Sequence, residues 1–172
     1  MIGANAEGSA LLRGFCEDQE IKTNRHGGVR HRTWDRNMMM QVLIVENNAK
    51  LATILKDFVE IDHKHSVTGT ASDLDGAIAS IEACSPQLAL IDLHLAGTAT
   101  GIEVAARARE HQMPTLFTTA SPLPFPVPEL ALGCLCKPYN CYSVAQSLRI
   151  AELLLIGGAA NRDDVPPELE IY

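Results

Sequence analysis

The sequence predicts an α/β fold built on a doubly wound, five-stranded parallel sheet. Short apolar runs alternate with segments of helical periodicity across residues 41–156, which is the pattern of repeated strand–helix units. The first run, residues 42–45, is apolar at every position, as in a central strand that is covered on both faces. For five such strands we expect the order 2-1-3-4-5, which brings the carboxyl ends of four strands around one crevice.

The first half of this pattern contains three strands and two helices. After the first strand, apolar residues recur at helical spacing and predict a helix over residues 48–61. Residues 66–71 form a second strand, and Ser72 opens a variant of the capping box that begins the next helix. The third strand, residues 88–95, is an apolar run that delivers the carboxylate of Asp92 at its end.

The second half holds the last two strands and two further helices. We expect a helix over residues 102–111, a strand over 114–118, a strand over 133–136 and a helix over 141–156. Asn140 is the predicted N-cap of the last helix.

Four prolines occupy every second position between the last two strands: Pro122, Pro124, Pro126 and Pro128. Each proline removes a hydrogen-bond donor and disfavours helical backbone in the residue before it. We therefore expect the fourth helix of this fold to be reduced to a turn near residues 129–132, or to be absent.

Composition limits the organisation and the partners of the chain. Residues 1–40 and 157–172 lack the periodicity and are expected to be tails on either side of one domain, residues 41–156. The chain carries 21 acidic and 14 basic residues, a net charge of −7, which argues against nucleic-acid binding. The five cysteines show no metal-ligand spacing and fit the buried thiols of a cytoplasmic protein. No apolar run is long enough for a membrane span.

Polar residues stand at the carboxyl ends of four predicted strands. Glu46 and Asn47 follow the first, Asp92 ends the third, Thr119 follows the fourth and Lys137 follows the fifth. Two facing carboxylates suit Mg²⁺, a hard cation that prefers oxygen ligands. A carboxylate beside such an ion can accept a phosphoryl group, and a lysine and a hydroxyl can hold the phosphoryl oxygens.

Four segments, residues 42–47, 89–101, 115–120 and 133–138, resemble the receiver domain of bacterial two-component response regulators. The resemblance implies the flavodoxin-like fold and Asp92 as the phosphoacceptor. It implies that Lys137 pairs with Asp92 and later with its phosphate, and that the Thr119 hydroxyl moves toward the phosphoryl group. It also implies the Ala120 amide as a phosphate donor.

The resemblance further implies a Mg²⁺ site formed by Glu46, Asp92 and the backbone carbonyl of His94, but two positions depart from the family pattern. Asn47 replaces the second residue of the usual acidic pair, which removes a charge and predicts weak Mg²⁺ binding. Cys134 stands where an aromatic switch residue is expected, three positions before Lys137. His94 follows Asp92 by two residues, which leaves a proton-handling role for its ring open, but we expect its backbone to be what the site requires.

Two functions remain open. In the first, the protein is a stand-alone receiver, not an enzyme, that a histidine kinase or histidine phosphotransfer protein phosphorylates on Asp92 and that signals to a downstream protein. In the second, Asn47 and Cys134 mark a degenerate pseudo-receiver that acts by binding alone. A flavin-binding protein is disfavoured, because the turn after the first strand has no glycine-rich phosphate cradle.

The last predicted helix is more apolar than one buried face requires. Ile150, Leu153, Leu154 and Ile156 extend beyond the expected buried stripe. Either the reduced fourth helix leaves more surface for this helix to cover, or the face binds a partner. We expect a partner surface here, with a homodimer through the last helix as one form of it.

Overall fold

The computed structural model describes residues 39–95 and 99–172, so most of the expected N-terminal tail lies outside the described residues. The elements in chain order are β1 (Met40–Val45), α2 (Ala49–Glu60), β2 (His65–Ala71), α3 (Leu74–Cys84), β3 (Leu88–Asp92), α4 (Gly101–Glu110), β4 (Thr115–Thr119), β5 (Gly133–Cys136), α5 (Cys141–Leu155), a 3₁₀ turn η1 (Arg162–Asp164) and β6 (Leu169–Ile171). Among the described residues, no helix is both long and apolar enough to cross a membrane.

The sheet has the order β2-β1-β3-β4-β5-β6, so the expected order 2-1-3-4-5 is confirmed and one strand is added. The first five strands pair in parallel, and β6 pairs antiparallel with β5. In the register of the central pair, Asp92 lies opposite Thr118. Because the five parallel strands run in one direction, their carboxyl ends lie along one edge of the sheet.

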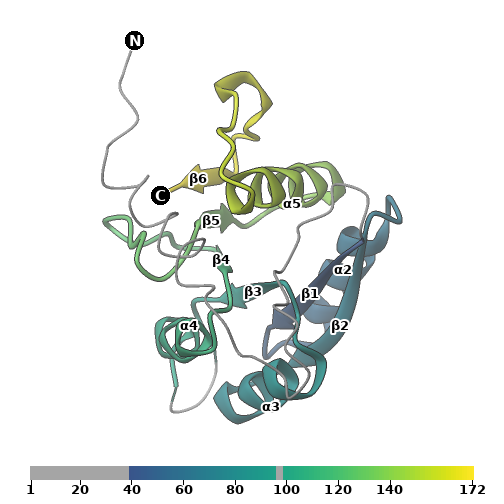
Figure 1. Cartoon of the computed structure of the whole chain (residues 1–172), viewed down its shortest axis with the longest axis vertical. Coiled ribbons are helices and arrows are strands. Elements are labelled where there is room, and N and C mark those ends of the chain that lie inside the picture. Colours follow the sequence, from purple (N-terminus) through teal and green to yellow (C-terminus); the bar gives the residue numbers. More distant parts are fainter. Residues whose placement is uncertain (1–38, 96–98) are drawn as a thin grey trace, which may run out of the picture.

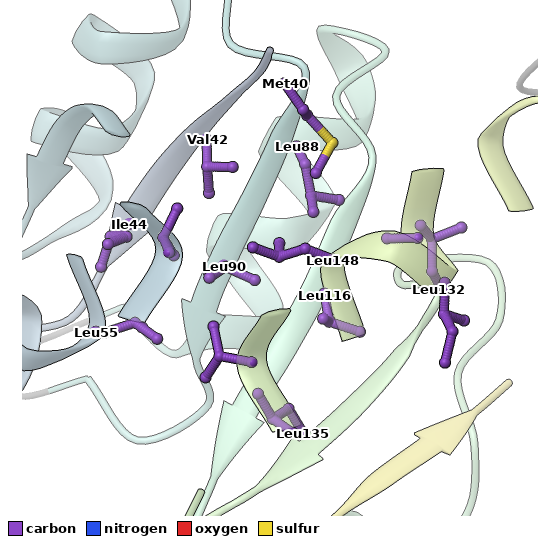
Figure 2. Close-up of a cluster of buried hydrophobic side chains, with 14 of the residues drawn as sticks. Met40, Val42, Ile44, Leu55, Leu88, Leu90, Leu116, Leu132, Leu135 and Leu148 are labelled. Carbon is purple, nitrogen blue, oxygen red and sulfur yellow. The ribbon is translucent and has the colours of Figure 1, made fainter. Parts of the chain in front are cut away.

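Apolar side chains cover both faces of the sheet and form two cores. One core joins α2 and α5 to one face, and Figure 2 shows part of it, with Leu90 and Leu116 beside Leu148 of α5 and Ile44 near Leu55 of α2. The other core joins α3 and α4 to the opposite face. Figure 1 shows α3 and α4 together on one side of the sheet, with α5 on the other. Since β1 and β3 are buried on both faces, each of them is an almost continuous apolar run.

Side chains at the helix starts satisfy the free backbone donors there. Asn48 caps α2, and Thr100 forms a full capping box with Glu103 at the start of α4. The predicted cap at Asn140 is confirmed. The predicted cap of α3 at Ser72 is wrong by one residue, because the Asp73 carboxylate accepts the Gly76 N–H and Ser72 only donates to Asp73.

The segment between β4 and β5 contains no helix among its described residues, as the prolines predict. It makes a single turn in which the N–H groups of Leu130 and Ala131 both donate to the carbonyl of Val127. Leu123, Val127 and Leu130 pack against the core on the α3–α4 face. The proline segment, residues 120–132, therefore covers the surface where the fourth helix would lie.

The C-terminal residues correct the expectation of a tail over 157–172. Residues 169–171 form β6, whose Leu169 is buried in the α2–α5 core. Gly133 permits the pairing, because a Cβ at this position would lie 2.2 Å from the Glu170 carbonyl oxygen. A strand of three residues is too short to show a period of two, so the sequence pattern could not reveal it.

Half of the expected apolar surplus on α5 is buried within the chain. Ile150 and Leu154 are core residues, and Ala160, Val165 and Ile171 of the C-terminal segment pack against the same core. Figure 1 shows this segment folded back beside α5. The C-terminal segment and α2 therefore cover Ile150 and Leu154, whereas Ile156 is 37% exposed, so a partner surface or homodimer at this end of α5 stays a prediction.

Candidate functional site

Three charged side chains meet at the carboxyl edge of the sheet. Asp92 is the last residue of β3, Glu46 follows β1 and Lys137 follows β5. Lys137 Nζ lies 2.8 Å from Asp92 Oδ2 and 2.9 Å from Glu46 Oε2. The structure thus brings together three residues that are far apart in the sequence.

The two carboxylates of this cluster are almost completely buried. Glu46 is 4% exposed and Asp92 6% exposed. Burial raises the pKa of the Asp92 carboxyl, but hydrogen bonds from Lys137 and the His94 N–H outweigh it, so the pKa lies below its usual value. Burial lowers the pKa of Lys137, but the two carboxylates raise it overall. Both shifts favour the charged forms, so Asp92 is a carboxylate and Lys137 an ammonium at neutral pH.

The second oxygen of each carboxylate is held by the backbone. Asp92 Oδ1 accepts the His94 N–H at 3.1 Å, and Glu46 Oε1 accepts the Asn48 N–H at 2.9 Å. These bonds fix the orientation of both carboxylates, so that the other oxygen of each faces Lys137.

Thr119 ends β4 beside this cluster and is fully buried. Its Oγ1 lies 3.0 Å from Nδ1 of the His94 ring and 3.1 Å from both the N–H and the carbonyl of Ser121. The sequence interpretation favoured the His94 backbone over its ring, yet the structure places the ring against the Thr119 hydroxyl. The position of His94 two residues after Asp92 was the signal in the sequence that could have indicated a role for its side chain.

Gly101 is a structural residue of the site that sequence reasoning did not single out. A Cβ at Gly101 would lie 2.2 Å from the Asp92 carbonyl oxygen and 2.7 Å from the Leu93 Cα. Its N–H donates to the Leu93 carbonyl at 3.3 Å. The N-terminus of α4 therefore packs directly on the backbone that carries Asp92, and only glycine fits there.

The two positions that depart from the family pattern differ in their surroundings. Asn47 is half-buried and follows Glu46 at the rim of the cluster. Asn47 and Glu46 line a cleft of about 390 Å³ together with three alanines and polar residues such as Thr53 and Lys56. Cys134 is buried in the core on the α3–α4 face, and burial raises the pKa of its thiol to about 12. At neutral pH this thiol is protonated and unreactive.

An aromatic ring nevertheless reaches the position of Cys134. Tyr172 follows β6 and packs, partly buried, against the same core as Cys134. Its N–H donates to the Leu132 carbonyl at 3.1 Å. The added strand thus places a tyrosine at the end of the proline segment.

The site offers oxygen atoms to a metal ion. The described residues contain no group of three or more His, Cys, Asp or Glu side chains arranged to bind a metal. The available donors are the carboxylates of Glu46 and Asp92, the Asn47 amide and backbone carbonyls. This set fits a hard, partly hydrated cation such as Mg²⁺ and excludes a soft-metal site.

Comparisons with known proteins give one family. The model of the response regulator receiver domain matches residues 42–139, more than half of the chain. A search of curated protein sequences finds no significant match.

Solved structures of similar fold include a longer response regulator and receiver domains solved on their own. The response regulator PhyR from Brucella abortus is 26% identical with a TM-score of 0.58, over 71% of this chain and 50% of PhyR. This chain thus spans about half the length of that protein. The signal receiver domain of a modulated diguanylate cyclase from Desulfovibrio desulfuricans G20 is 28% identical with a TM-score of 0.57, over 66% of this chain and 94% of that domain. A CheY-like receiver from Methanospirillum hungatei JF-1, 21% identical with a TM-score of 0.60 over 66% of this chain and 94% of its own, shares the fold.

Proposed function

Because the chain belongs to the response regulator receiver domain family, we propose that it accepts a phosphoryl group on Asp92 in a two-component phosphorelay. The observation that supports this most strongly is the position of Lys137, 2.8 Å from Asp92 and 2.9 Å from Glu46. The ammonium of Lys137 keeps Asp92 ionised, so that Asp92 can act as the nucleophile. It also lies close enough to contact the oxygens of a phosphoryl group on Asp92.

The proposed donor is a phosphohistidine of a histidine kinase or of a histidine phosphotransfer protein. An Asp92 oxygen attacks the phosphorus, an O–P bond forms and the P–N bond breaks. The electron pair stays on the leaving imidazole, which takes a proton from solvent. The product is an acyl phosphate on Asp92, and water later hydrolyses it to restore the carboxylate.

The residues around Asp92 have separate roles in this proposal. The Lys137 ammonium moves from the Asp92 carboxylate to a phosphoryl oxygen and keeps its contact with Glu46. The Thr119 hydroxyl and the Ala120 N–H donate to the remaining phosphoryl oxygens. A Mg²⁺ ion would be held by Glu46, Asp92 and the His94 carbonyl, with Asn47 as a weaker ligand. When bound, it neutralises charge on the transferring oxygens.

The proposed output is contact with a downstream protein. Receiver domains are generally signalling modules and not enzymes, and the proline segment gives this receiver a surface without the fourth helix. Thr119 Oγ1 bonds to both the N–H and the carbonyl of Ser121, where that segment starts. When the Thr119 hydroxyl turns its proton toward a phosphoryl group, the Ser121 carbonyl loses that donor, which changes the first residues of the proline segment. We place this signalling in the cytoplasm.

The experiment is phosphorylation by a small donor. The protein is incubated with Mg²⁺ and acetyl phosphate, and its intact mass is measured. We expect a gain of one phosphoryl group that is absent in Asp92→Asn. The matched control is Asp57→Asn, which removes an exposed carboxylate of α2 and should leave the gain unchanged.

The alternative is a pseudo-receiver controlled by binding alone. Asn47, which removes a charge from the metal site, and Cys134, which replaces the usual aromatic residue, favour it. A folded wild-type protein that gains no mass at any Mg²⁺ concentration, from acetyl phosphate or from a phosphohistidine donor, would support this alternative and refute phosphorylation of Asp92.

A further inference from the structure

His94 connects two residues of the site through different parts of its structure. Its backbone N–H donates to Asp92 Oδ1 at 3.1 Å, and its ring Nδ1 lies 3.0 Å from Thr119 Oγ1. The His94 side chain is otherwise exposed, whereas Thr119 is fully buried. The ring therefore reaches in from the solvent side to the one polar atom of the Thr119 side chain.

The hydrogen-bonding capacity of the Thr119 hydroxyl decides what the ring does. A hydroxyl has one proton to donate and two lone pairs that accept. The Ser121 N–H donates into one lone pair at 3.1 Å, and the Ser121 carbonyl lies 3.1 Å away, where it accepts the hydroxyl proton. The remaining lone pair is filled if Nδ1 of His94 carries a proton and donates to Oγ1. We assign this tautomer from the hydrogen-bond network.

In this arrangement two donors fix the Thr119 oxygen, and its proton is the part that can move. The proton turns from the Ser121 carbonyl to a phosphoryl oxygen on Asp92 without the loss of either donor. Without the His94 ring, the oxygen is held from the Ser121 side alone, and the hydroxyl loses its fixed direction.

We propose that the imidazole of His94 is a positioning residue that holds the Thr119 hydroxyl in place to bind the phosphoryl group on Asp92. This inference rests on the proposed function and adds a residue to it. It assigns to the side chain a role that is separate from that of the His94 backbone.

Substitution of His94 isolates the ring, because every variant keeps the backbone N–H and carbonyl. The ring is exposed, so its removal leaves no cavity in the core. Asparagine carries an amide nitrogen at the same δ position as Nδ1, whereas the glutamine amide lies one carbon farther out. His94→Asn can keep the bond to Thr119, and His94→Gln and His94→Leu cannot keep it in the same geometry.

The measurements are the rate constants for phosphorylation by acetyl phosphate in Mg²⁺ and the fraction phosphorylated at steady state, from intact mass. We expect His94→Leu and His94→Gln to lower the phosphorylation rate constant by about threefold to tenfold, as for the loss of one hydrogen bond. We expect His94→Asn to stay within about twofold of the wild type. The control is His111→Leu, an exposed histidine that follows α4, which should change nothing.

A double-mutant cycle tests whether the ring acts through Thr119. In a Thr119→Ala background, His94→Leu should have no further effect, because the ring has no hydroxyl to hold. The inference is overturned if His94→Leu matches the wild type, if His94→Asn is as impaired as His94→Leu, or if the His94→Leu effect persists in Thr119→Ala. If the wild type itself takes up no phosphoryl group, the proposed function fails and this inference fails with it. A phosphorylated wild type with an unaffected His94→Leu overturns this inference alone.

Discussion

Lys137 Nζ lies 2.8 Å from Asp92 Oδ2, and this ion pair joins the carboxyl end of β5 to that of β3. The same ammonium contacts Glu46 at 2.9 Å, so one cation balances two buried carboxylates. A buried charge that loses its partner is costly, even when the intact pair contributes little. The Lys137–Asp92 ion pair therefore contributes to the stability of the fold as well as to the chemistry of the site.

We predict that Lys137→Met lowers the free energy of unfolding by about 2 kcal/mol, because it leaves two buried carboxylates without a counter-ion. Urea unfolding at neutral pH measures this loss. Adding Asp92→Asn should restore part of it, since one of the two charges is then gone. The control is Lys56→Met, which breaks an exposed pair with Glu60 on α2 and should cost less than about 0.5 kcal/mol. Equal losses in the two lysine variants would contradict the prediction.

We predict that Asn47→Asp strengthens Mg²⁺ binding by about tenfold, because it adds a carboxylate beside Glu46 and Asp92. Isothermal titration of Mg²⁺ into both proteins measures the difference. Without Mg²⁺, the variant should unfold at a lower urea concentration than the wild type, since a third carboxylate then repels the other two. An unchanged affinity would place the metal, if it binds, away from Asn47.

We predict that Gly101→Ala disturbs Asp92 through the backbone. The new Cβ would lie 2.2 Å from the Asp92 carbonyl oxygen, so α4 or the end of β3 must shift. We expect a loss of more than about 2 kcal/mol in unfolding free energy and slower phosphorylation. Gly69→Ala is the control, because the nearest atom to its new Cβ is at an ordinary 3.5 Å. If Gly101→Ala were as mild as Gly69→Ala, α4 would not be seated on the Asp92 backbone.

His65 makes stability depend on pH. Burial lowers its pKa from the usual 6.5, Asp62 opposes this shift, and Lys64 and Arg149 add to it. The unfolded chain therefore binds more protons than the folded protein just below 6.5, and the free energy of unfolding falls as the solution becomes mildly acidic. Glu152, at 3.6 Å from His65, offsets little of this loss, because burial raises its own pKa and favours its neutral form.

We predict that His65→Leu flattens this pH dependence and stabilises the protein at neutral pH. Neither ring nitrogen of His65 has a hydrogen-bond partner among the described residues, so removing the ring saves about 1 kcal/mol. Urea unfolding at neutral and mildly acidic pH gives both quantities. His111→Gln, at an exposed site, should leave the pH profile as it is. A profile for His65→Leu that still falls like that of the wild type would assign the effect to another group.

We predict that Leu169→Ala lowers the unfolding free energy by about 2 to 3 kcal/mol, because Leu169 is a buried core residue of β6. Glu170→Ala, at an exposed position of the same strand, should cost less than about 0.5 kcal/mol. Thermal or urea unfolding measures both. A loss below about 0.5 kcal/mol for Leu169→Ala would mean that β6 is not part of the cooperative fold in solution.

The sequence was sufficient for the parallel sheet because its strands are buried on both faces. The runs that form β1 and β3 are almost entirely apolar, and such runs are hard to mistake. The same property located the site, since Glu46 and Asp92 are the polar residues at which these two runs stop. Proline chemistry likewise predicted the missing fourth helix.

The features that sequence could not supply depend on contacts between distant segments. β6 exists because Gly133 leaves room for the Glu170 carbonyl, and no local pattern records that fit. The apolar residues of α5 looked unpartnered because the segment that covers them was taken as a tail. The pairing of the His94 ring with Thr119 depends on how two loops approach each other across β3 and β4.

The antiparallel strand β6 also determines what the sheet offers to other molecules. With β5 as the last strand, the apolar segment Gly133–Cys136 would present unpaired backbone groups, which template the addition of a strand from a neighbouring chain. β6, which is the edge strand instead of β5, has only three residues and exposes the charge of Glu170. Short, charged edges are poor templates for such growth. The C-terminal segment thus makes this edge of the sheet a poor template for edge-to-edge aggregation, in addition to its packing role.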